Sequence, residues 1–450
     1  MSTTIDHVRA LTPEQKDKEV RRVLGSSFLG SVIEYYDFFL YASAASLVFA
    51  PVFFSNLNPL AGTIASLATF AAGYVARPVG GLIFGHFGDR LGRKKMLILS
   101  MTGMGIGSFL IALIPPAAAI GSWGAVMLVT LRILQGIAVG GEWGGAALMS
   151  LEHAKTKSRG FAASFASAGG PAGIFLATGA LGLAALLPHD AFLAWGWRIP
   201  FLASAALLVV GLAVRAKVSE SPVFKASMTM QEENQKESAP IVEVLRRPKV
   251  LILTTLSCIA LFSISSMAST FGVTYAVGGG ARSSSVLFAL SFTELFTVAV
   301  TLVSARLSDT LGRRWLMIGG GIAFALAAYP LFAAMGSGSI VLVFIAFTIF
   351  KVCFATIYGP MAAFVSEQHP ARSRYTGASL SYQLASLIGA GFTPIILASI
   401  YAASGRDVAP VIWFLIGMCV ISAVAIFLTR ESKDNDLISG AAVEDLATNP

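Results

Sequence analysis

Seven ionisable side chains lie in stretches of the sequence that are otherwise apolar. Four are acids and three are cations: Glu34, Asp37, Glu142, Glu294, Arg77, Arg132 and Lys351. Charged groups within a bilayer are costly, so such residues normally face a cavity or a partner and mark pathways for ions or substrates. The chemistry on offer is proton uptake and release by a carboxyl group, and binding of a substrate carboxylate by a cation.

Glu34 and Asp37 stand three residues apart in the stretch 30-GSVIEYYDFFLYA-42. At about 100° per residue of a helix, they share one face with Tyr41. Low dielectric disfavours a charged carboxyl group and a nearby cation favours it, so a carboxyl group that moves between these settings takes up and releases a proton. We predict this role for Asp37, with Glu34 in support. The alternative is a permanent ion pair that fixes helix packing.

Arg132 is the predicted cationic partner. It shares one helical face with Gln135, Glu142 and Trp143, a polar stripe that ends in a flat aromatic side chain. The planar guanidinium group matches a carboxylate, whether that of Asp37 or of a substrate. Arg132 therefore enters both the predicted proton-coupling set and the predicted substrate site, with a purely structural counter-ion as the alternative.

Other polar residues in the apolar stretches complete the predicted substrate site. Lys351 shares a helical face with Tyr358. Arg77 precedes Pro78, where a kink would turn its side chain inward. The predicted substrate-binding residues are Tyr41, Arg77, Arg132, Gln135, Glu142, Trp143, Glu294, Lys351, Tyr358, Tyr382 and Gln383. Because the three cations face four acids, no fixed positive surplus is evident, which favours a substrate with one or two carboxylates over citrate.

The elements that must carry these residues are membrane helices. Hydrophobic residues make up 55% of the 450 positions, charged residues only 12%, and the mean hydropathy is +0.74, far from the balance of a soluble domain. Apolar runs long enough to cross a bilayer recur and alternating strand patterns are absent, which predicts an all-α integral membrane protein. Twelve spans are predicted, at 24–49, 62–86, 96–115, 122–150, 160–187, 196–216, 250–275, 284–306, 315–335, 339–365, 374–403 and 409–429.

The net charge of +8 reflects the predicted topology and gives no sign of a nucleic-acid partner. With the N-terminus inside, about 26 of the 32 Lys and Arg residues fall on the cytoplasmic side, as the positive-inside rule requires. Both termini are therefore expected to be cytoplasmic. The first 23 residues are unlike a cleaved secretory signal, so the first span is expected to be retained. Cys258, Cys353 and Cys419 all fall in predicted spans, which indicates neither a disulfide framework nor a metal site.

The sequence repeats itself after six predicted spans. The segment 85-GHFGDRLGRKK-95 returns as 305-ARLSDTLGRRW-315 at an offset of 220, and 152-EHAKTKSRGFAAS-164 returns as 367-EQHPARSRYTGAS-379 at an offset of 215. Such a parallel duplication places a substrate site between the halves and suits rocking alternating access. The predicted divisions are a cytoplasmic segment at 1–23, a six-helix bundle at 24–216, a cytoplasmic linker at 217–249, a second six-helix bundle at 250–429 and a cytoplasmic tail at 430–450.

The repeated loops carry charges that can pair when the inner ends of the halves meet. The predicted cytoplasmic gate consists of Gly85, Asp89, Arg93, Glu152, Arg159, Asp309, Arg313, Glu367 and Arg374. Ordinary positive-inside loops are the alternative, although duplication of both the acids and the bases favours a gate. The second copy has Ala305 for Gly85 and Thr310 for Arg90, so its pairing is the weaker prediction.

The loop at 85–95 and its second copy resemble the signature of the major facilitator superfamily. The wider set 34-EYYDF-38, 77-RPVGGLIFGHFGDRLGRKK-95, 132-RILQGIAVGGEWGGAA-147, 195-WGWRIPFL-202 and 220-ESPVF-224 is similar to the metabolite:proton symporters of that superfamily. The resemblance covers nearly the whole chain and implies twelve transmembrane helices in two six-helix halves, with alternating access. In distantly similar sugar–proton carriers an acid in the first span and an arginine in the fourth form the coupling pair, and Asp37 and Arg132 match those positions. In the superfamily the repeated loop latches the outward-facing state.

The resemblance further implies proton-driven uptake of a small carboxylated metabolite such as shikimate, an aromatic acid or a dicarboxylate across the cytoplasmic (inner) membrane. The proton is the coupling ion, no cofactor is expected, and a monomer in the lipid bilayer is expected to suffice. A passive facilitator or an exporter of the same fold is the main alternative. A proline or betaine symporter is less favoured, because the tail after Arg430 lacks the coiled-coil heptads of that branch. The sequence has no P-loop, zinc-binding helix motif or serine elbow, so an enzyme is not expected.

Overall fold

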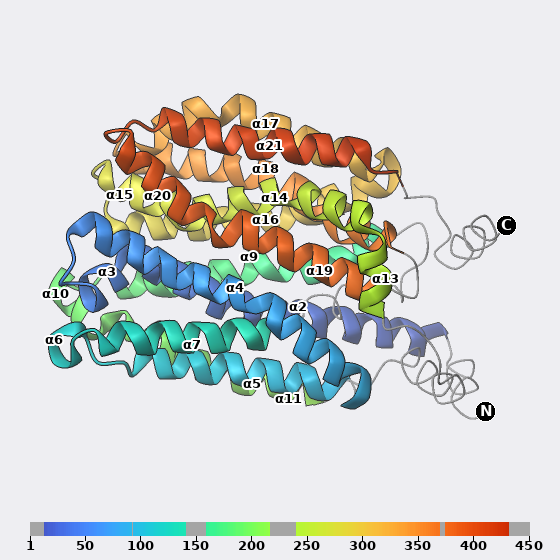
Figure 1. The fold of residues 1–450 in the computed structure, drawn as a ribbon, viewed down its shortest axis with the longest axis horizontal. Coiled ribbons are helices and arrows are strands. Elements are labelled where there is room, and N and C mark those ends of the chain that lie inside the picture. The colour runs from blue at the N-terminus through green and yellow to red at the C-terminus, as the bar shows by residue number, and fades with distance from the viewer. Residues whose placement is uncertain (1–12, 92, 141–158, 217–239, 370–373, 432–450) are drawn as a thin grey trace.

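The structure is a computed structural model that describes residues 13–91, 93–140, 159–216, 240–369 and 374–431. Within these ranges every regular element is a helix, and the long helices run roughly along one common axis (Figure 1). The elements are α2 (Pro13–Leu47), α3 (Phe49–Phe53), α4 (Pro59–Leu91), α5 (Arg93–Ala112), α6 (Ala117–Ile120), α7 (Trp123–Val139), α9 (Arg159–Ala184), α10 (His189–Ala191), the π-helical η2 (Phe192–Gly196), α11 (Arg198–Ala216), α13 (Pro240–Arg246), α14 (Pro248–Ser269), α15 (Phe271–Gly278), α16 (Ser283–Leu311), α17 (Arg313–Met335), α18 (Ile340–Glu367), α19 (Arg374–Ser386), the π-helical η3 (Leu387–Gly391), α20 (Thr393–Ala403) and α21 (Ala409–Leu428).

The apolar runs of the sequence form the long helices. Nine helices in the described ranges are long and apolar enough to cross a membrane, and two shorter apolar helices, Ile98–Ala112 and Trp123–Val139, accompany them. Each predicted span overlaps at least one helix, although the last residues of the span 122–150 lie outside the described ranges. These helices confirm the prediction of an all-α membrane protein.

Two predicted spans are interrupted rather than continuous. The span 250–275 divides at Thr270, which leaves the helical conformation with φ −126° and ψ −83° and separates α14 from α15. The Thr270 hydroxyl donates to the Ser266 carbonyl oxygen at 2.5 Å, so one backbone acceptor at the break is satisfied by a side chain. The span 374–403 contains the π-helical turn η3, which the periodicity of the sequence does not predict.

Helix boundaries follow the internal repeat of the sequence. α4 and α16 end at Leu91 and Leu311, which are separated by the same offset as the first pair of repeated segments. α9 and α19 begin at Arg159 and Arg374, which are separated by the offset of the second pair. Gly312 joins α16 to α17 with φ +97°, a left-handed conformation that favours glycine. Matching boundaries are what a duplication of helices predicts.

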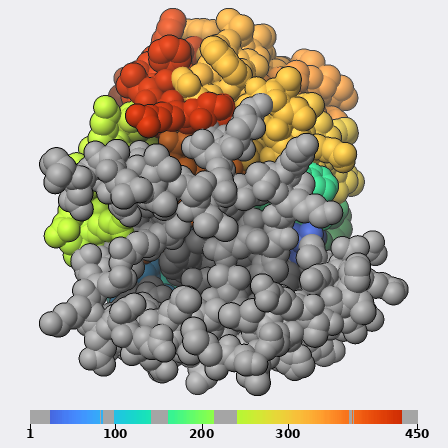
Figure 2. Space-filling view, turned by 90° about the vertical axis from the view of Figure 1, so that its right-hand side faces the viewer, coloured from blue at the N-terminus to red at the C-terminus, as the bar shows by residue number. Residues whose placement is uncertain are grey.

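The first and second parts of the chain meet along the middle of the molecule. α9 packs along both α2 and α16, and α16 packs along α18. In Figure 1 helices α5, α7 and α11 lie on one side of this contact and α17, α18 and α21 on the other. Figure 2 views the molecule from the end at which α16 ends and α17 begins, with α17 and α21 on one side of the outline. We call this the gate end, because the described residues of the predicted gate lie there.

Apolar side chains also cover the outside of the helices. Leu326 on α17 is 79% exposed and Trp123 at the start of α7 is 70% exposed. Contiguous apolar surface of this kind would promote aggregation in water, whereas it suits contact with lipid. Polar side chains of the spans are instead directed inward, where the candidate site lies.

Candidate functional site

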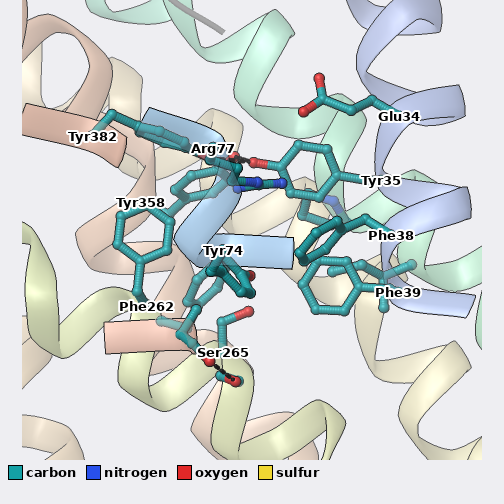
Figure 3. A pocket seen from close by; sticks show the side chains of 15 residues that line it. Glu34, Tyr35, Phe38, Phe39, Tyr74, Arg77, Phe262, Ser265, Tyr358 and Tyr382 are labelled. Carbon is teal, nitrogen blue, oxygen red and sulfur yellow. Dashed lines mark hydrogen bonds between the residues drawn. The ribbon is translucent and has the colours of Figure 1, made fainter. Parts of the chain in front are cut away.

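A cavity lies between the two parts of the chain, with about 530 Å³ of space between atoms, part of which is open to solvent (Figure 3). Its walls come from α2, α4, α9, α14, α18, α19 and η3. The lining residues are Glu34, Tyr35, Phe38, Phe39, Tyr74, Arg77, Pro171, Ile174, Phe262, Ser265, Ser266, Phe354, Tyr358, Tyr382 and Ala390. The lining is rich in aromatic rings, with two charged side chains among it.

Three tyrosine hydroxyl groups meet at one wall of this cavity. The Tyr35 hydroxyl on α2 lies 2.6 Å from that of Tyr382 and 3.1 Å from that of Tyr358, so hydrogen bonds join the two parts of the chain (Figure 3). The ring of Phe262 packs edge-on against Tyr382 with 4.9 Å between centroids. The cavity thus offers hydroxyl groups that can donate to or accept from a polar ligand.

Arg77 brings a buried positive charge to the same cavity. Its side chain is only 6% exposed and its guanidinium group lies over the rings of Phe38 and Tyr74, at 4.2 and 4.7 Å from their centroids. No described residue forms an ion pair or hydrogen bond with Arg77, and its Nε is buried without a partner. A Cβ at Gly140 on the neighbouring segment would collide with the Arg77 carbonyl oxygen, so close packing against the end of α7 fixes this part of α4.

Asp37 faces a second, smaller space rather than the cavity. That space of about 230 Å³ lies between α2, α5 and α11, and is lined by Ile33, Glu34, Asp37, Met101, Met104, Gly105 and Leu208. The Ser204 hydroxyl on α11 donates to the Asp37 carboxyl oxygen at 2.5 Å. Glu34 lines both spaces, whereas Asp37 lines only the smaller one.

Arg132 lies inside a box of aromatic rings on α2 and α4. Its guanidinium carbon is 4.1 Å from the centroid of Phe38, 4.2 Å from that of Tyr41 and 5.3 Å from that of Phe70. Within the part of the chain that the structure describes, none of its nitrogens is within 4 Å of a carboxylate. The predicted ion pair with Asp37 is therefore not formed in this conformation, and its formation elsewhere in the transport cycle stays a prediction.

Glu294 and Lys351 form an ion pair of 2.5 Å between α16 and α18, and both side chains are fully buried. Neither residue lines the cavity. In the present conformation they therefore contribute to the contact between two helices of the second part of the chain, away from the cavity, and their predicted role in substrate binding stays a prediction.

The remaining predicted substrate residues are held by other side chains. The Tyr41 hydroxyl donates to Thr69 Oγ1 at 2.6 Å, and Gln135 Nε2 donates to Ser108 Oγ at 2.9 Å. Gln383 Nε2 on α19 donates to the Gly140 carbonyl oxygen at 3.1 Å, a hydrogen bond between the two parts of the chain. Arg77, Tyr358 and Tyr382 are the predicted substrate residues that line the cavity, while Glu142 and Trp143 lie outside the described residues.

Charged side chains join the described residues of the predicted gate. Asp309 accepts hydrogen bonds from the backbone N–H groups of Gly160 and Phe161, at 3.0 and 3.1 Å, and so caps the first turn of α9 from the end of α16. Arg313 pairs with Asp309 at 3.2 Å, and binds both oxygens of Glu367 at 2.7 and 2.8 Å.

Other predicted gate residues are only partly described. The Arg374 Nε donates to the His369 carbonyl oxygen at 3.3 Å. Gly85, Asp89, Arg93 and Arg159 lie in helices whose side-chain surroundings at these positions are outside the description, and Glu152 lies outside the described ranges.

The family model of the Major Facilitator Superfamily matches residues 27–380 and 280–446. This chain belongs to the Major Facilitator Superfamily. It is 37% identical over 446 residues to the inner membrane metabolite transport protein YhjE of Escherichia coli K12, covering 97% of this chain and 99% of that relative. It is also 37% identical over 419 residues to the shikimate transporter of the same organism, with 92% and 95% covered. A proline/betaine transporter of Salmonella typhimurium is 31% identical over 436 residues, with 94% and 85% covered.

Solved structures of the superfamily share the fold. The xylose transporter XylE from E. coli, in a partially occluded inward-open conformation, aligns with a TM-score of 0.73 over 93% of this chain and 100% of that one, at 19% identity. Superfamily membership confirms the predicted fold class and the prediction of a transporter rather than an enzyme. The curated relatives likewise confirm the resemblance to metabolite transporters of the superfamily.

Sequence reasoning missed several residues that build the site of this major facilitator protein. Tyr35 and Tyr74 line the cavity, yet neither was predicted, because an aromatic residue in an apolar run gives no sign of which face it occupies. Ser204, the partner of Asp37, is one of many serines in the spans. His369, after α18, is 4% exposed. Burial lowers the pKa of His369 to about 4, and the positive charges of Arg374 and Arg247 act in the same direction.

Proposed function

We propose that this protein is a proton-coupled symporter that takes up a small carboxylated metabolite across the inner membrane, with both termini in the cytoplasm. The observation that carries the proposal is Arg77, whose buried guanidinium group lies in the central cavity without a described anionic partner. A buried charge without a counter-charge is costly, so an anion that enters the cavity recovers part of that cost. A carboxylate fits the planar fork of Arg77 in a bidentate manner.

The rest of the cavity favours a ring-bearing acid such as shikimate. Aromatic walls suit a flat or puckered carbon ring, and the hydroxyl groups of Tyr35, Tyr358 and Tyr382 can bind ring hydroxyls. The relative named a shikimate transporter supports this choice among the acids. Other aromatic acids and dicarboxylates share the carboxylate and are competitors in the test.

We propose that Asp37 and Glu34 couple transport to protons, and that Arg132 is the cation that pairs with the charged carboxylate of Asp37. Both acids are buried on α2 next to the cavity wall, where the charged state of a carboxyl group depends on its partners. The bundles 24–216 and 250–429 would rock about the cavity in alternating access, without a cofactor.

The first test concerns the carboxylate and Arg77. Purified protein in proteoliposomes should take up radiolabelled shikimate, and unlabelled aromatic acids and dicarboxylates should be ranked as competitors. Arg77→Gln should raise the half-saturating substrate concentration by about 30-fold or more, because loss of one partner of a buried charge pair costs about 2 kcal/mol or more. Arg77→Lys should lose less, since it keeps the charge and loses only the fork.

Arg282→Gln is the matched control, because Arg282 is an exposed residue just before α16, away from the cavity. Unchanged half-saturation in Arg77→Gln, or a panel in which no carboxylate competes, would remove the carboxylate proposal.

The second test concerns coupling. An inward proton gradient should drive accumulation, and substrate influx should acidify the lumen. Transport that only equilibrates substrate and ignores the gradient would identify a passive facilitator. Accumulation driven by an outward-directed proton gradient, with protons leaving as substrate enters, would identify an exporter that works by exchange.

A further inference from the structure

Asp37 and Arg132 are close neighbours that this conformation keeps apart. Asp37 receives the Ser204 hydroxyl at 2.5 Å, with no described cation within 4 Å of its carboxyl group. Arg132 instead stacks on Phe38, Tyr41 and Phe70, which we call the aromatic cage. The Nε and Nη2 atoms of Arg132 are buried and have no hydrogen-bond partner among the described residues. The third nitrogen, Nη1, donates to Gln135 Oε1 at 3.4 Å, so the cage holds the guanidinium group mainly by its face.

The rings of the cage are held by contacts that do not involve Arg132. The Tyr41 ring is fixed by its hydrogen bond to Thr69 Oγ1, and Thr69 in turn donates to the Ser66 carbonyl oxygen at 2.7 Å. Phe49 packs edge-on against Tyr41 with 5.0 Å between centroids. On α4, Gly73 leaves room for the Arg132 stem, because a Cβ there would lie 2.7 Å from Arg132 Nε. Such a preformed site favours a cation at little ordering cost.

The surroundings of Asp37 suit a carboxyl group that carries a proton. Asp37 has two hydroxyl partners, Ser204 and Ser108, and no described cation within 4 Å. A carboxylic acid is neutral and hydrogen-bonds with hydroxyl groups at little cost, whereas a carboxylate with hydroxyl partners alone is costly to bury. Among the described residues, the charged and titratable groups around Asp37 and Arg132 are Arg77 and Tyr74 on α4, and Glu34, Tyr36 and Tyr41 on α2. The described neighbours of Asp37 on α5 and α11 contribute hydroxyl groups and apolar side chains, and no charge.

We propose that the aromatic cage is the place Arg132 occupies while Asp37 is protonated, and that loss of this proton moves Arg132 from the rings to the Asp37 carboxylate. The inference rests on the proposed proton coupling and adds three residues to it. The proton leaves from the Asp37 carboxyl oxygen to water, and Arg132 keeps its charge throughout. A cation–π contact is exchanged for an ion pair, which is an exchange between two favourable states rather than between a favourable and an unfavourable one.

Phe38 gives this exchange a route to the substrate cavity. The centroid of its ring lies 4.1 Å from the guanidinium carbon of Arg132 and 4.2 Å from that of Arg77, and the side chain lines the cavity. When Arg132 leaves, one of two cations is removed from the ring that positions Arg77. The protonation state of Asp37 therefore alters the support of the proposed carboxylate-binding group without touching the substrate.

The test compares Tyr41→Leu with Tyr41→Phe. Both variants lose the hydroxyl group, and only Tyr41→Leu loses the aromatic ring. The pH dependence of gradient-driven uptake is measured in proteoliposomes. Without the ring the caged state is weakened and the Arg132–Asp37 pair is favoured, so Asp37 binds its proton less tightly. The midpoint at which uptake declines with rising pH should move to lower pH by about half a unit to one unit in Tyr41→Leu. Tyr41→Phe keeps the ring and its contact with Phe49, so it should shift the midpoint by clearly less than Tyr41→Leu.

Phe70→Leu removes a second ring of the cage and provides an independent variant should Tyr41→Leu fail to fold. It should shift the midpoint in the same direction and by less, because Phe70 is the more distant ring. A proton-driven wild type whose midpoint is unmoved by loss of either ring, or moved to higher pH, overturns the cage. A wild type without proton-driven uptake overturns the proposed symport itself, so the two failures are told apart.

Discussion

His369 shows how one buried side chain links pH to stability at the gate end. Its ring nitrogen Nε2 lies 3.4 Å from Ser381 Oγ on α19, and Arg374 and Arg247 add positive charge around it. The folded protein therefore keeps this imidazole neutral, with a pKa of about 4 instead of the usual 6.5. The unfolded chain binds the proton at higher pH, so folding stability must fall as pH drops from about 6.5 to about 4.

We expect His369→Gln to remove this pH dependence. In wild type the window between the two pKa values corresponds to up to about 3 kcal/mol of lost stability. The thermal unfolding midpoints measured in detergent at pH 7.5 and at pH 4.5 should be similar for the variant and should differ for wild type. His189→Gln is the control, because His189 is an exposed histidine at the other end of the molecule. Equal slopes for His369→Gln and wild type would contradict the assignment.

The pairing of α16 with α18 depends on the buried Glu294–Lys351 ion pair. Removing one partner leaves a charge in a fully buried place, whereas removing both leaves an apolar contact. Glu294→Gln alone should therefore lower stability by about 3 to 5 kcal/mol, and Glu294→Leu combined with Lys351→Met should restore it to about the wild-type level or above. Chemical unfolding in detergent measures both.

Uptake by the double variant separates packing from transport. A protein that is stable and transports normally uses the pair for helix contact alone, as the structure suggests. A stable protein that no longer transports would return Glu294 and Lys351 to the predicted substrate or proton pathway. A double variant no more stable than Glu294→Gln would contradict the packing argument.

Long helices were the most predictable elements of this protein. An uninterrupted apolar segment can satisfy its backbone hydrogen bonds within a bilayer by forming a helix, which is why the predicted spans overlap helices. The break at Thr270 and the π-turn η3 escaped prediction, because they depend on side-chain hydrogen bonds and packing that no hydropathy pattern carries. The same limit applies to the site. Asp37 and Arg132 were recognisable as buried charges, but no sequence pattern indicates that aromatic rings would hold Arg132 away from the acid.

The two halves of the chain are joined at the gate end through Asp309. Its carboxylate accepts hydrogen bonds from the first turn of α9 and also pairs with Arg313. It therefore connects the positive N-terminal end of a helix with a cationic side chain. The tyrosine contacts of Tyr35 join the same halves within the cavity. Both sets of contacts would have to change in the proposed rocking of the halves.

Asp309→Asn should open the gate end. The amide loses the negative charge that favours both contacts, so the closed population should fall by about tenfold for each 1.4 kcal/mol lost. Spin labels on Leu99→Cys and Leu311→Cys, both exposed sites on α5 and α16, would report a longer distance by pulsed electron resonance. The native cysteines in the described ranges are buried, so labelling should be selective.

Asp407→Asn is the matched control for the gate. Asp407 accepts a hydrogen bond from the Ala409 N–H at the start of α21 and takes no part in contacts at the gate end. Identical distance distributions for Asp309→Asn and Asp407→Asn would show that the gate does not depend on this carboxylate.

The Glu294–Lys351 pair also bears on how the protein is made. Glu294 enters the membrane with α16, and α17 must follow before α18 delivers Lys351. During that interval a lone acid stands in a hydrophobic segment, which costs about 2.5 to 3.5 kcal/mol on the scale of helix insertion. Assembly of this half is therefore ordered by charge, since α16 reaches its lowest free energy in the bilayer only once the third helix of the group has arrived.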